Sequence, residues 1–126
     1  MAQHNQLGSA GEQAARDHLI GKGLVIRDMN WRLNHLEIDI VAYDTTRNVL
    51  HIVEVKTRRT AIHYDPMKSI TPTKIRNLVN AASGYLHYYR MHCGVQYDVI
   101  IVIGQPEHFE IVYIPNAFRP PLRTYR

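Results

Sequence analysis

The sequence predicts an α/β fold, a mixed β-sheet flanked by helices with its elements in the order α-β-β-β-α-β-β. Apolar residues recur at helical intervals in two segments, one near the N-terminus and one after residue 71. Five other segments are short, rich in Val and Ile, and either alternate in polarity or run continuously apolar, as strands do. The 126 residues, 45% apolar and 21% charged, suit one domain spanning residues 1–126.

Composition argues against several classes of protein. No segment approaches the roughly 18 apolar residues that span a bilayer, and the start MAQHNQLGSAGE lacks an apolar signal-peptide segment. We therefore expect a cytoplasmic protein without membrane contact. The single cysteine, Cys93, offers neither an intrachain disulfide nor a paired-cysteine zinc site. Fifteen Lys and Arg against eleven Asp and Glu give a net charge of +4, which mildly favours polyanionic partners.

The first two elements are predicted to be a helix and a strand. Ser9 and Glu12 have the spacing of a capping box, and the apolar residues that follow predict a helix over roughly residues 9–21. Glu12 is then either the acidic half of that cap or a side chain directed toward the sheet. The mixed segment Leu24–Arg32 is expected to hold a strand, followed by a turn at residues 34–35.

The next two strands are predicted to form an antiparallel hairpin. Leu36–Tyr43 alternates with period two, and only the short polar segment 44–48 separates it from Val49–Lys56. Both faces of the second strand are largely apolar, so we expect it to be central and covered on both sides. In the first strand, Glu37 and Asp39 share a face with Val41 and Tyr43. Its other face is predicted to carry Leu36, Ile38, Ile40 and Ala42.

A long connection and a second helix follow. The polar segment Thr57–Ile70 is long for a structureless loop, which indicates mobility or function. Thr71 is a predicted helix cap with Pro72 at the first helical position, and the helix is expected to end near residues 92–94. Its apolar stripe comprises Ile75, Leu78, Val79, Ala82, Tyr85, Leu86 and Tyr89.

Two strands and a tail complete the chain. Val95–Gly104 is predicted to be a buried strand, and the segment around Phe109–Ile114 a shorter strand at an edge. Residues 115–126 contain prolines and arginines and no acidic residue, so we expect an irregular basic tail.

Charged side chains interrupt the two central apolar strands. Two carboxylates about 4 Å apart repel by on the order of 4 kcal/mol at an effective dielectric of 20. A protein tolerates such a pair if a divalent cation, a proton or cationic side chains compensate it. Residues on one face of a hairpin lie roughly 5 Å apart, so Asp39 and Glu54 converge if the register allows, with Lys56 on the same face as Glu54. These groups suit a Mg²⁺ or Mn²⁺ site that hydrolyses phosphodiesters; solvated cross-strand pairs or a structural ion-pair network in a protein-interaction domain are the alternatives.

The pattern of Asp39 followed fifteen residues later by Glu54-Val55-Lys56 resembles the PD-(D/E)xK nuclease superfamily, whose restriction-endonuclease-like core is a mixed sheet flanked by helices. More closely, the chain resembles the YraN-like family, an uncharacterised protein family related to archaeal Holliday-junction resolvases. Leu36 stands where that family usually has Gly. The matching segments are Gly8-Ser9-Ala10-Gly11-Glu12, Asn30-Trp31-Arg32, Glu37-Ile38-Asp39-Ile40-Val41-Ala42, Val53-Glu54-Val55-Lys56-Thr57-Arg58, Ile70-Thr71-Pro72-Thr73-Lys74, Ala81-Ala82, Tyr85-Leu86 and Tyr97-Asp98-Val99.

This resemblance implies a metal-dependent endonuclease that hydrolyses DNA phosphodiester bonds, with branched or structured DNA as a candidate substrate and a homodimer as a candidate assembly. Asp39 and Glu54 would be metal ligands, Lys56 would position or activate the attacking water, and Glu12 would be an additional catalytic acid. Glu37 would be accessory. The alternative is a catalytically weak or inactive nucleic-acid-binding module that keeps the nuclease-like fold.

Basic side chains near the predicted site are candidates for phosphate contacts. Arg32 stands at a strand end beside Trp31, which is more often a core residue than a base-stacking one. The other candidates surround the long connection and the start of the second helix, and are Arg58, Arg59, Lys68, Lys74 and Arg76. A solvated basic face is the alternative interpretation of this group.

Overall fold

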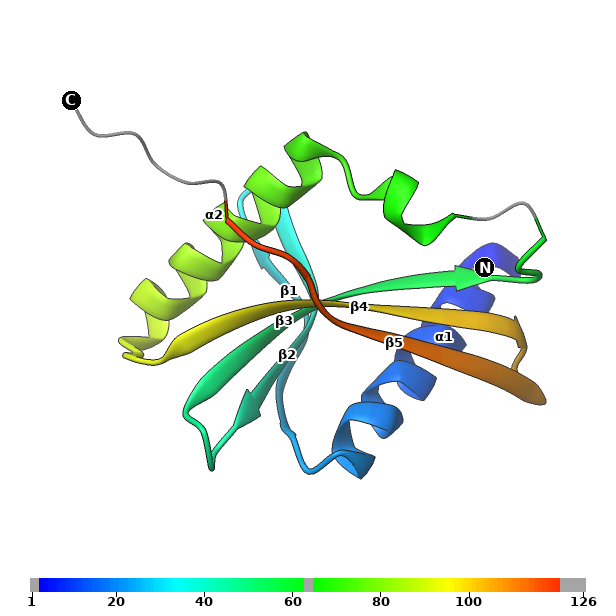
Figure 1. Ribbon diagram of the computed structural model, residues 1–126, viewed down its shortest axis with the longest axis horizontal. Helices are drawn as coiled ribbons and strands as arrows, with labels where there is room; N and C mark the ends of the chain where they lie inside the picture. Colours follow the sequence, from blue (N-terminus) through cyan, green and yellow to red (C-terminus); the bar gives the residue numbers. More distant parts are fainter. Residues whose placement is uncertain (1–2, 63–64, 121–126) are drawn as a thin grey trace.

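A computed structural model describes residues 3–62 and 65–120, without the side chains at 3–5 and 66–67. Five strands form one sheet in the order β1-β2-β3-β4-β5, with α1 on one face and α2 on the other (Figure 1). The predicted class and element order are confirmed. The elements are α1 (Gln3–Gly21), β1 (Val25–Leu33), β2 (Leu36–Asp44), β3 (Val49–Arg58), the short 3-10 helix η1 (Pro66–Ser69), α2 (Pro72–Tyr89), β4 (Gly94–Gln105) and β5 (His108–Phe118).

Strand β3 is central and covered on both faces, as predicted. It pairs antiparallel with β2 and parallel with β4, because α2 carries the chain across the sheet between them. The buried cluster on the α2 face comprises Ile38, Val41, Leu50, Ile52, Leu78, Ala81, Ala82, Tyr85 and Tyr97. The buried cluster on the α1 face comprises Ala15, Leu19, Ile40, Ala42, Val53, Ile100 and Val102.

The side-chain alternation of β2 changes phase at Asp39, so the predicted single apolar face of this strand is wrong. Ile38 is buried on the α2 face, whereas Ile40 is buried on the α1 face. A regular strand would put two residues of this spacing on the same face. In β1, Asn30 lies between the residues paired with Ile38 and Ile40 and has a left-handed backbone with φ 52°. Because of this irregularity, the side chain of Asp39 does not follow the regular alternation of a β-strand.

Helix α1 begins at Gln3, six residues before the predicted start. Ser9 and Glu12 therefore lie inside the helix, and the capping-box interpretation is wrong. The glycines at 8 and 11 and Ser9 lower the helix propensity of this segment, which made it resemble a helix boundary. Tertiary packing outweighs that propensity, because Ala15 and Leu19 are fully buried against the sheet.

Close approach of α1 to β3 depends on Gly11. A Cβ at this position would overlap the side chain of Thr57, whereas a Cβ at Gly8 would meet nothing within 4 Å. Gly11→Ala should therefore lower the free energy of unfolding by about 1–3 kcal/mol, despite the better helix propensity of Ala. Gly8→Ala should be neutral or stabilising by up to about 1 kcal/mol. Urea denaturation measures both, and adding Thr57→Ala to Gly11→Ala should restore stability; equal effects of the two glycine substitutions would contradict this packing.

Helix α2 begins as predicted and ends earlier. The Thr71 side chain accepts a hydrogen bond from the Lys74 backbone N–H at 3.1 Å, which confirms the predicted cap. The helix ends at Tyr89, because Arg90 adopts a left-handed conformation with φ 53° and its N–H bonds to helix carbonyls. Tyr85 is fully buried as expected, whereas Tyr89 is 39% exposed and only borders the core.

Strand β5 is longer than predicted and continues to Phe118. Its extension includes an irregularity opposite Tyr97 and Val99, where Asn116 has a left-handed backbone with φ 51°. Pro115 fits because β5 is an edge strand and needs no partner on its outer side. The predicted irregular tail of residues 115–126 thus begins in the sheet, and its last part, residues 121–126, lies outside the described residues.

Candidate active site

The β2–β3 ladder ends at Ile40 and Val53. Beyond this pair, β2 stays paired with β1, and β3 stays paired with β4, so the sheet divides into two parts. In Figure 1, the C-terminal end of β1 (cyan) turns toward α2, whereas β3 runs on beside β4 to its arrowhead. Asp39 and Glu54 are the next residues of their strands, so both carboxylates stand at the point of division.

Asp39 replaces the missing ladder contact with its side chain. Its Oδ2 accepts a hydrogen bond from the Val55 backbone N–H at 2.9 Å. Burial and the nearby Glu54 carboxylate raise the pKa of Asp39 to about 8, against the opposing effect of the Val55 N–H. In the absence of a metal ion, Asp39 therefore keeps a proton near neutral pH.

Glu54 has two cationic partners. It is 5% exposed, and its Oε2 lies 3.2 Å from the Lys56 ammonium and in direct contact with the Lys74 ammonium. Burial alone would raise the pKa of Glu54, but Lys74 and Lys56 outweigh this effect and lower it. Burial and the neighbouring Lys74 also lower the pKa of Lys56. The two carboxyl groups are thus compensated in different ways, Asp39 by a proton and Glu54 by two lysines.

An open cavity of about 580 Å³ gives solvent access to this cluster. Its walls come from α1, the β1–β2 turn, β2, β3 and the first turns of α2. The lining residues are Glu12, His35, Leu36, Glu37, Asp39, Glu54, Val55, Lys56, Thr71, Thr73, Lys74, Asn77 and Leu78. All four predicted catalytic residues, Asp39, Glu54, Lys56 and Glu12, therefore face one cavity.

Glu12 reaches this cavity from α1 and is held by a residue that sequence reasoning did not select. Asn30 donates its side-chain N–H to Glu12 Oε1 at 3.0 Å. Asn30 belongs to β1, so this bond joins the first helix to the irregular part of the sheet. The charge of Glu12 also contributes to the raised pKa of Asp39, after burial and Glu54.

The predicted phosphate-binding residues do not all lie at the cavity. Lys74 lines it, and Arg32 forms a 3.5 Å ion pair with Glu37, which also lines it. Arg59 instead lines a separate hollow beside the β4–β5 turn. The remaining predicted residues are not part of the cavity wall, and these are Arg58, Lys68 and Arg76.

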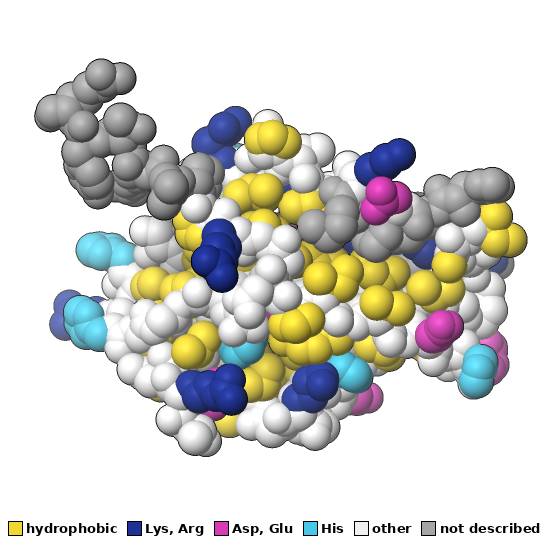
Figure 2. All heavy atoms as spheres, viewed as in Figure 1, with side chains coloured by type: hydrophobic (Ala, Val, Ile, Leu, Met, Phe, Trp, Pro, Cys, Tyr) yellow, Lys and Arg dark blue, Asp and Glu magenta, His cyan; other side chains and the backbone are white. Residues whose placement is uncertain are grey.

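On the face of the molecule shown in Figure 2, the basic side chains are scattered. Lys and Arg side chains stand apart from one another there, separated by hydrophobic and uncharged groups. A polyanion would find no continuous basic surface on that face. At the cavity itself, the donors that could contact a phosphate are Lys56, Lys74 and the first turn of α2.

The donor set of the cavity fits a hard divalent cation only with help from water. Within residues 3–62 and 65–120, no three His, Cys, Asp or Glu side chains form a group that could hold a metal ion. Mg²⁺ often binds through only one or two carboxylates and keeps several waters. Asp39 and Glu54 supply such a pair, and a bound cation would favour the charged form of Asp39, whose pKa is raised by burial and by the Glu54 carboxylate.

The fold and the cavity define an α/β protein with a buried carboxylate pair and two lysines where a mixed sheet divides. Comparison with known sequences identifies its family. The chain belongs to the uncharacterised protein family UPF0102, whose profile matches residues 11–102.

Relatives from several bacteria match over almost their full length. A UPF0102 protein from Bacteroides thetaiotaomicron is 44% identical over 122 residues, covering 97% of this chain and 99% of the relative. One from Bacteroides fragilis is 47% identical with the same coverage. One from Flavobacterium johnsoniae is 34% identical over 94% of this chain and 98% of the relative. Among the described helices, none is long and apolar enough to span a membrane.

Proposed function

We propose that this protein is a metal-dependent endonuclease that hydrolyses DNA phosphodiester bonds. One observation carries the proposal: Asp39, Glu54 and Lys56 converge in an open cavity at the division of the sheet. Two carboxylates with an adjacent lysine suit metal-assisted phosphodiester hydrolysis, because they can hold the metal ion and stabilise developing negative charge. The resemblance of these residues to the PD-(D/E)xK pattern supports the same chemistry.

Asp39 and Glu54 would hold Mg²⁺ or Mn²⁺, which supplies a Lewis acid for water activation and offsets charge on the scissile phosphate. Lys56 faces the cavity beside Glu54 and would hydrogen-bond to the attacking water or a phosphate oxygen. Glu12, which accepts a hydrogen bond from Asn30 of β1, would accept a proton or orient a second water. Thr71 and Thr73 line the cavity at the start of α2 and would offer backbone and hydroxyl donors to a neighbouring phosphate.

Lys74 has a separate role in this proposal. It compensates Glu54 while no metal ion is bound, so a divalent cation competes with its ammonium group. Lys74→Gln should therefore bind Mn²⁺ several-fold more tightly than the unmodified protein, because removal of one cation frees a Glu54 oxygen. Isothermal titration with Mn²⁺ measures this. Arg76→Gln, which removes an exposed cation of α2 outside the cavity, is the matched control.

The same titration separates a metal site from a purely structural ion-pair network. If the lysines served only to stabilise Glu54, Lys74→Gln would lower the melting temperature and Mn²⁺ would not restore it. A metal site instead predicts that Mn²⁺ raises the melting temperature by mass action, and more strongly in Lys74→Gln.

The direct test is cleavage of DNA by the purified chain. Linear duplex, single-stranded and four-way-junction DNA are incubated with Mg²⁺ or Mn²⁺, and products are resolved on denaturing gels. Glu54→Gln and Lys56→Met should each reduce the cleavage rate by roughly 10²–10³-fold, a typical loss when one stabilising group is removed. Glu107→Gln changes an exposed carboxylate in the β4–β5 turn and should leave the rate unchanged. Metal-dependent cleavage that persists in Glu54→Gln would refute the assignment.

A nucleic-acid-binding module with weak or no catalysis is the second candidate. It is favoured by the two lysines that compensate Glu54 and by the lack, in the described part of the chain, of a third acidic side chain grouped with the pair. Salt-dependent DNA binding without turnover would select it.

Symmetric cutting of a four-way junction needs two active centres, so light scattering with and without junction DNA tests the proposed homodimer.

A further inference from the structure

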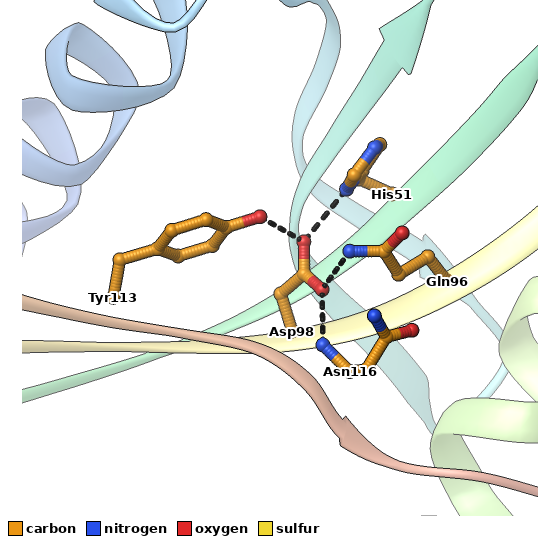
Figure 3. Close-up of polar contacts among 5 residues, drawn as sticks. All are labelled: His51, Gln96, Asp98, Tyr113 and Asn116. Atoms are coloured by element: carbon orange, nitrogen blue, oxygen red, sulfur yellow. Dashed lines mark hydrogen bonds and ion pairs between the residues drawn. The ribbon is translucent and has the colours of Figure 1, made fainter. Parts of the chain in front are cut away.

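A second polar cluster lies on the α1 face of the sheet, the face opposite to that of the Glu54 side chain. Its centre is Asp98, which is fully buried in β4. Asp98 accepts hydrogen bonds from four donors (Figure 3). They are His51 Nδ1 at 2.7 Å, Tyr113 Oη at 2.7 Å, Gln96 Nε2 at 2.9 Å and the Asn116 backbone N–H at 3.0 Å.

Asp98 fixes the orientation and tautomer of His51. Burial would raise the pKa of Asp98, but the four hydrogen bonds outweigh it and lower the pKa, so Asp98 is a carboxylate at neutral pH. A carboxylate only accepts hydrogen bonds, so His51 Nδ1 must carry a hydrogen. Figure 3 shows the other ring nitrogen, Nε2, directed away from Asp98. That nitrogen is the one that His51 can offer to a ligand.

His51 lines a cavity of about 250 Å³ between the end of α1 and the β2–β3 hairpin. The remaining lining residues are Lys22, Leu24, Asp44, Arg47, Val49, Gln96 and Tyr113. Among residues 3–62 and 65–120, neither Lys22 nor Arg47 forms an ion pair with an acidic side chain. Lys22 instead lies over the Tyr113 ring, with Nζ 5.3 Å from its centroid.

The acidic side chain that lines this cavity, Asp44, is held by backbone groups of its own turn. Asp44 Oδ1 accepts hydrogen bonds from the backbone N–H groups of Thr46 and Arg47. The terminal carbonyls of α1 are bonded by the N–H groups of residues 22–24. The cavity therefore presents an ammonium, a guanidinium and an oriented imidazole beside one carboxylate, Asp44, which forms no ion pair with Lys22 or Arg47 within the described residues.

We propose that this cavity binds a phosphate group, either inorganic phosphate or a phosphomonoester. Lys22 supplies a compact charge and Arg47 a planar pair of donors for the phosphate oxygens. In the neutral ring of His51, Nε2 carries the lone pair and can accept a hydrogen bond from a P–OH group, so these three groups suit a singly protonated phosphate. Lys22 and Arg47 also line an adjoining hollow of about 580 Å³, which leaves room for the organic part of an ester. This site is independent of the proposed nuclease activity, because Glu54 and His51 lie on opposite faces of β3.

The test is a titration at constant ionic strength with inorganic phosphate, phenyl phosphate, and phenol as the uncharged comparison. Two readouts are used, the nitrogen resonances of the His51 ring and the dissociation constant from calorimetry. Lys22→Gln/Arg47→Gln removes two exposed cations of the cavity, and Arg90→Gln/Arg119→Gln removes two exposed cations elsewhere. Both doubles lower the net charge equally and disturb no buried group.

Phosphate or phenyl phosphate is expected to shift the His51 Nε2 resonance, and Lys22→Gln/Arg47→Gln should weaken binding at least tenfold while the control double leaves it unchanged. Equal affinity for both phosphates identifies the free ion as the ligand, and tighter binding of phenyl phosphate identifies a monoester. The proposal is overturned if neither compound shifts the His51 resonance, or if both double variants lose affinity equally.

Discussion

Asp39→Asn is expected to abolish metal-dependent cleavage and, in metal-free buffer at pH 8, to make the protein more stable. Asp39 is a predicted metal ligand, so its loss removes one of the two proposed carboxylate ligands at the division of the sheet. It also carries an energetic cost, because burial and Glu54 raise its pKa to about 8. An amide removes that cost while its oxygen can still accept the Val55 N–H.

The pH dependence follows from the raised pKa of Asp39. The unfolded chain releases this proton near pH 3.8, whereas the folded protein holds it up to about pH 8. Stability from the protonated form is therefore fully present below pH 3.8 and is lost as the pH rises through about 8. Asp39→Asn should gain on the order of 2–5 kcal/mol over the unmodified protein at pH 8. At pH 4 the difference should be small.

Urea denaturation at pH 4, 6 and 8 in a chelating buffer measures this difference. Mn²⁺ should stabilise the unmodified protein at pH 8, because a cation replaces the proton, and should have little effect on Asp39→Asn. Asp17→Asn is the matched control, since the Asp17 side chain is 73% exposed on α1. If the stability of Asp39→Asn fell with rising pH as steeply as that of the unmodified protein, the proposed energetic cost of ionising Asp39 would be refuted.

The central hairpin and the convergence of Asp39 and Glu54 could be predicted from sequence, because both follow from local alternation and a short connection. The phase change at Asp39 could not, because it depends on the left-handed backbone of Asn30 in another strand. The ion pair between Lys74 and Glu54 could not be predicted from sequence either. It requires the first turn of α2 to lie across the end of β3, and no local pattern gives that distance.

Asp98 is the functional candidate that sequence reasoning passed over. The segment VQYDVIIVIG places one carboxylate inside a continuous apolar strand, which is the same signal that selected Asp39 and Glu54. Its partners come from β3, β4 and β5, with His51 separated from it by 47 residues. A buried carboxylate without a nearby partner in sequence indicates a tertiary network, and the network itself becomes visible only in three dimensions.

Asp98→Ala is expected to lower the free energy of unfolding by about 3–5 kcal/mol, a large part of the 5–15 kcal/mol typical of a domain. Four donors would lose their acceptor, among them the backbone N–H of Asn116 at the irregular part of β5. Gln96→Ala, which removes one of those donors, should cost only about 1 kcal/mol. Urea denaturation at pH 7 measures both. Asp98→Ala within 1 kcal/mol of Gln96→Ala would contradict a central role for the carboxylate.

Acid sensitivity provides a second measurement of the same carboxylate. The hydrogen bonds of Asp98 outweigh burial and lower its pKa in the folded state, so its stabilisation is present above pH 3.8 and is lost as the pH falls through the lower folded value. Asp98→Asn cannot ionise, and one of the two carboxylate oxygens is replaced by an NH2 group, a donor that faces other donors. It should be less stable than the unmodified protein at pH 7, with a difference that narrows in acid. A difference independent of pH would mean that packing, and not the charge of Asp98, joins β5 to the sheet.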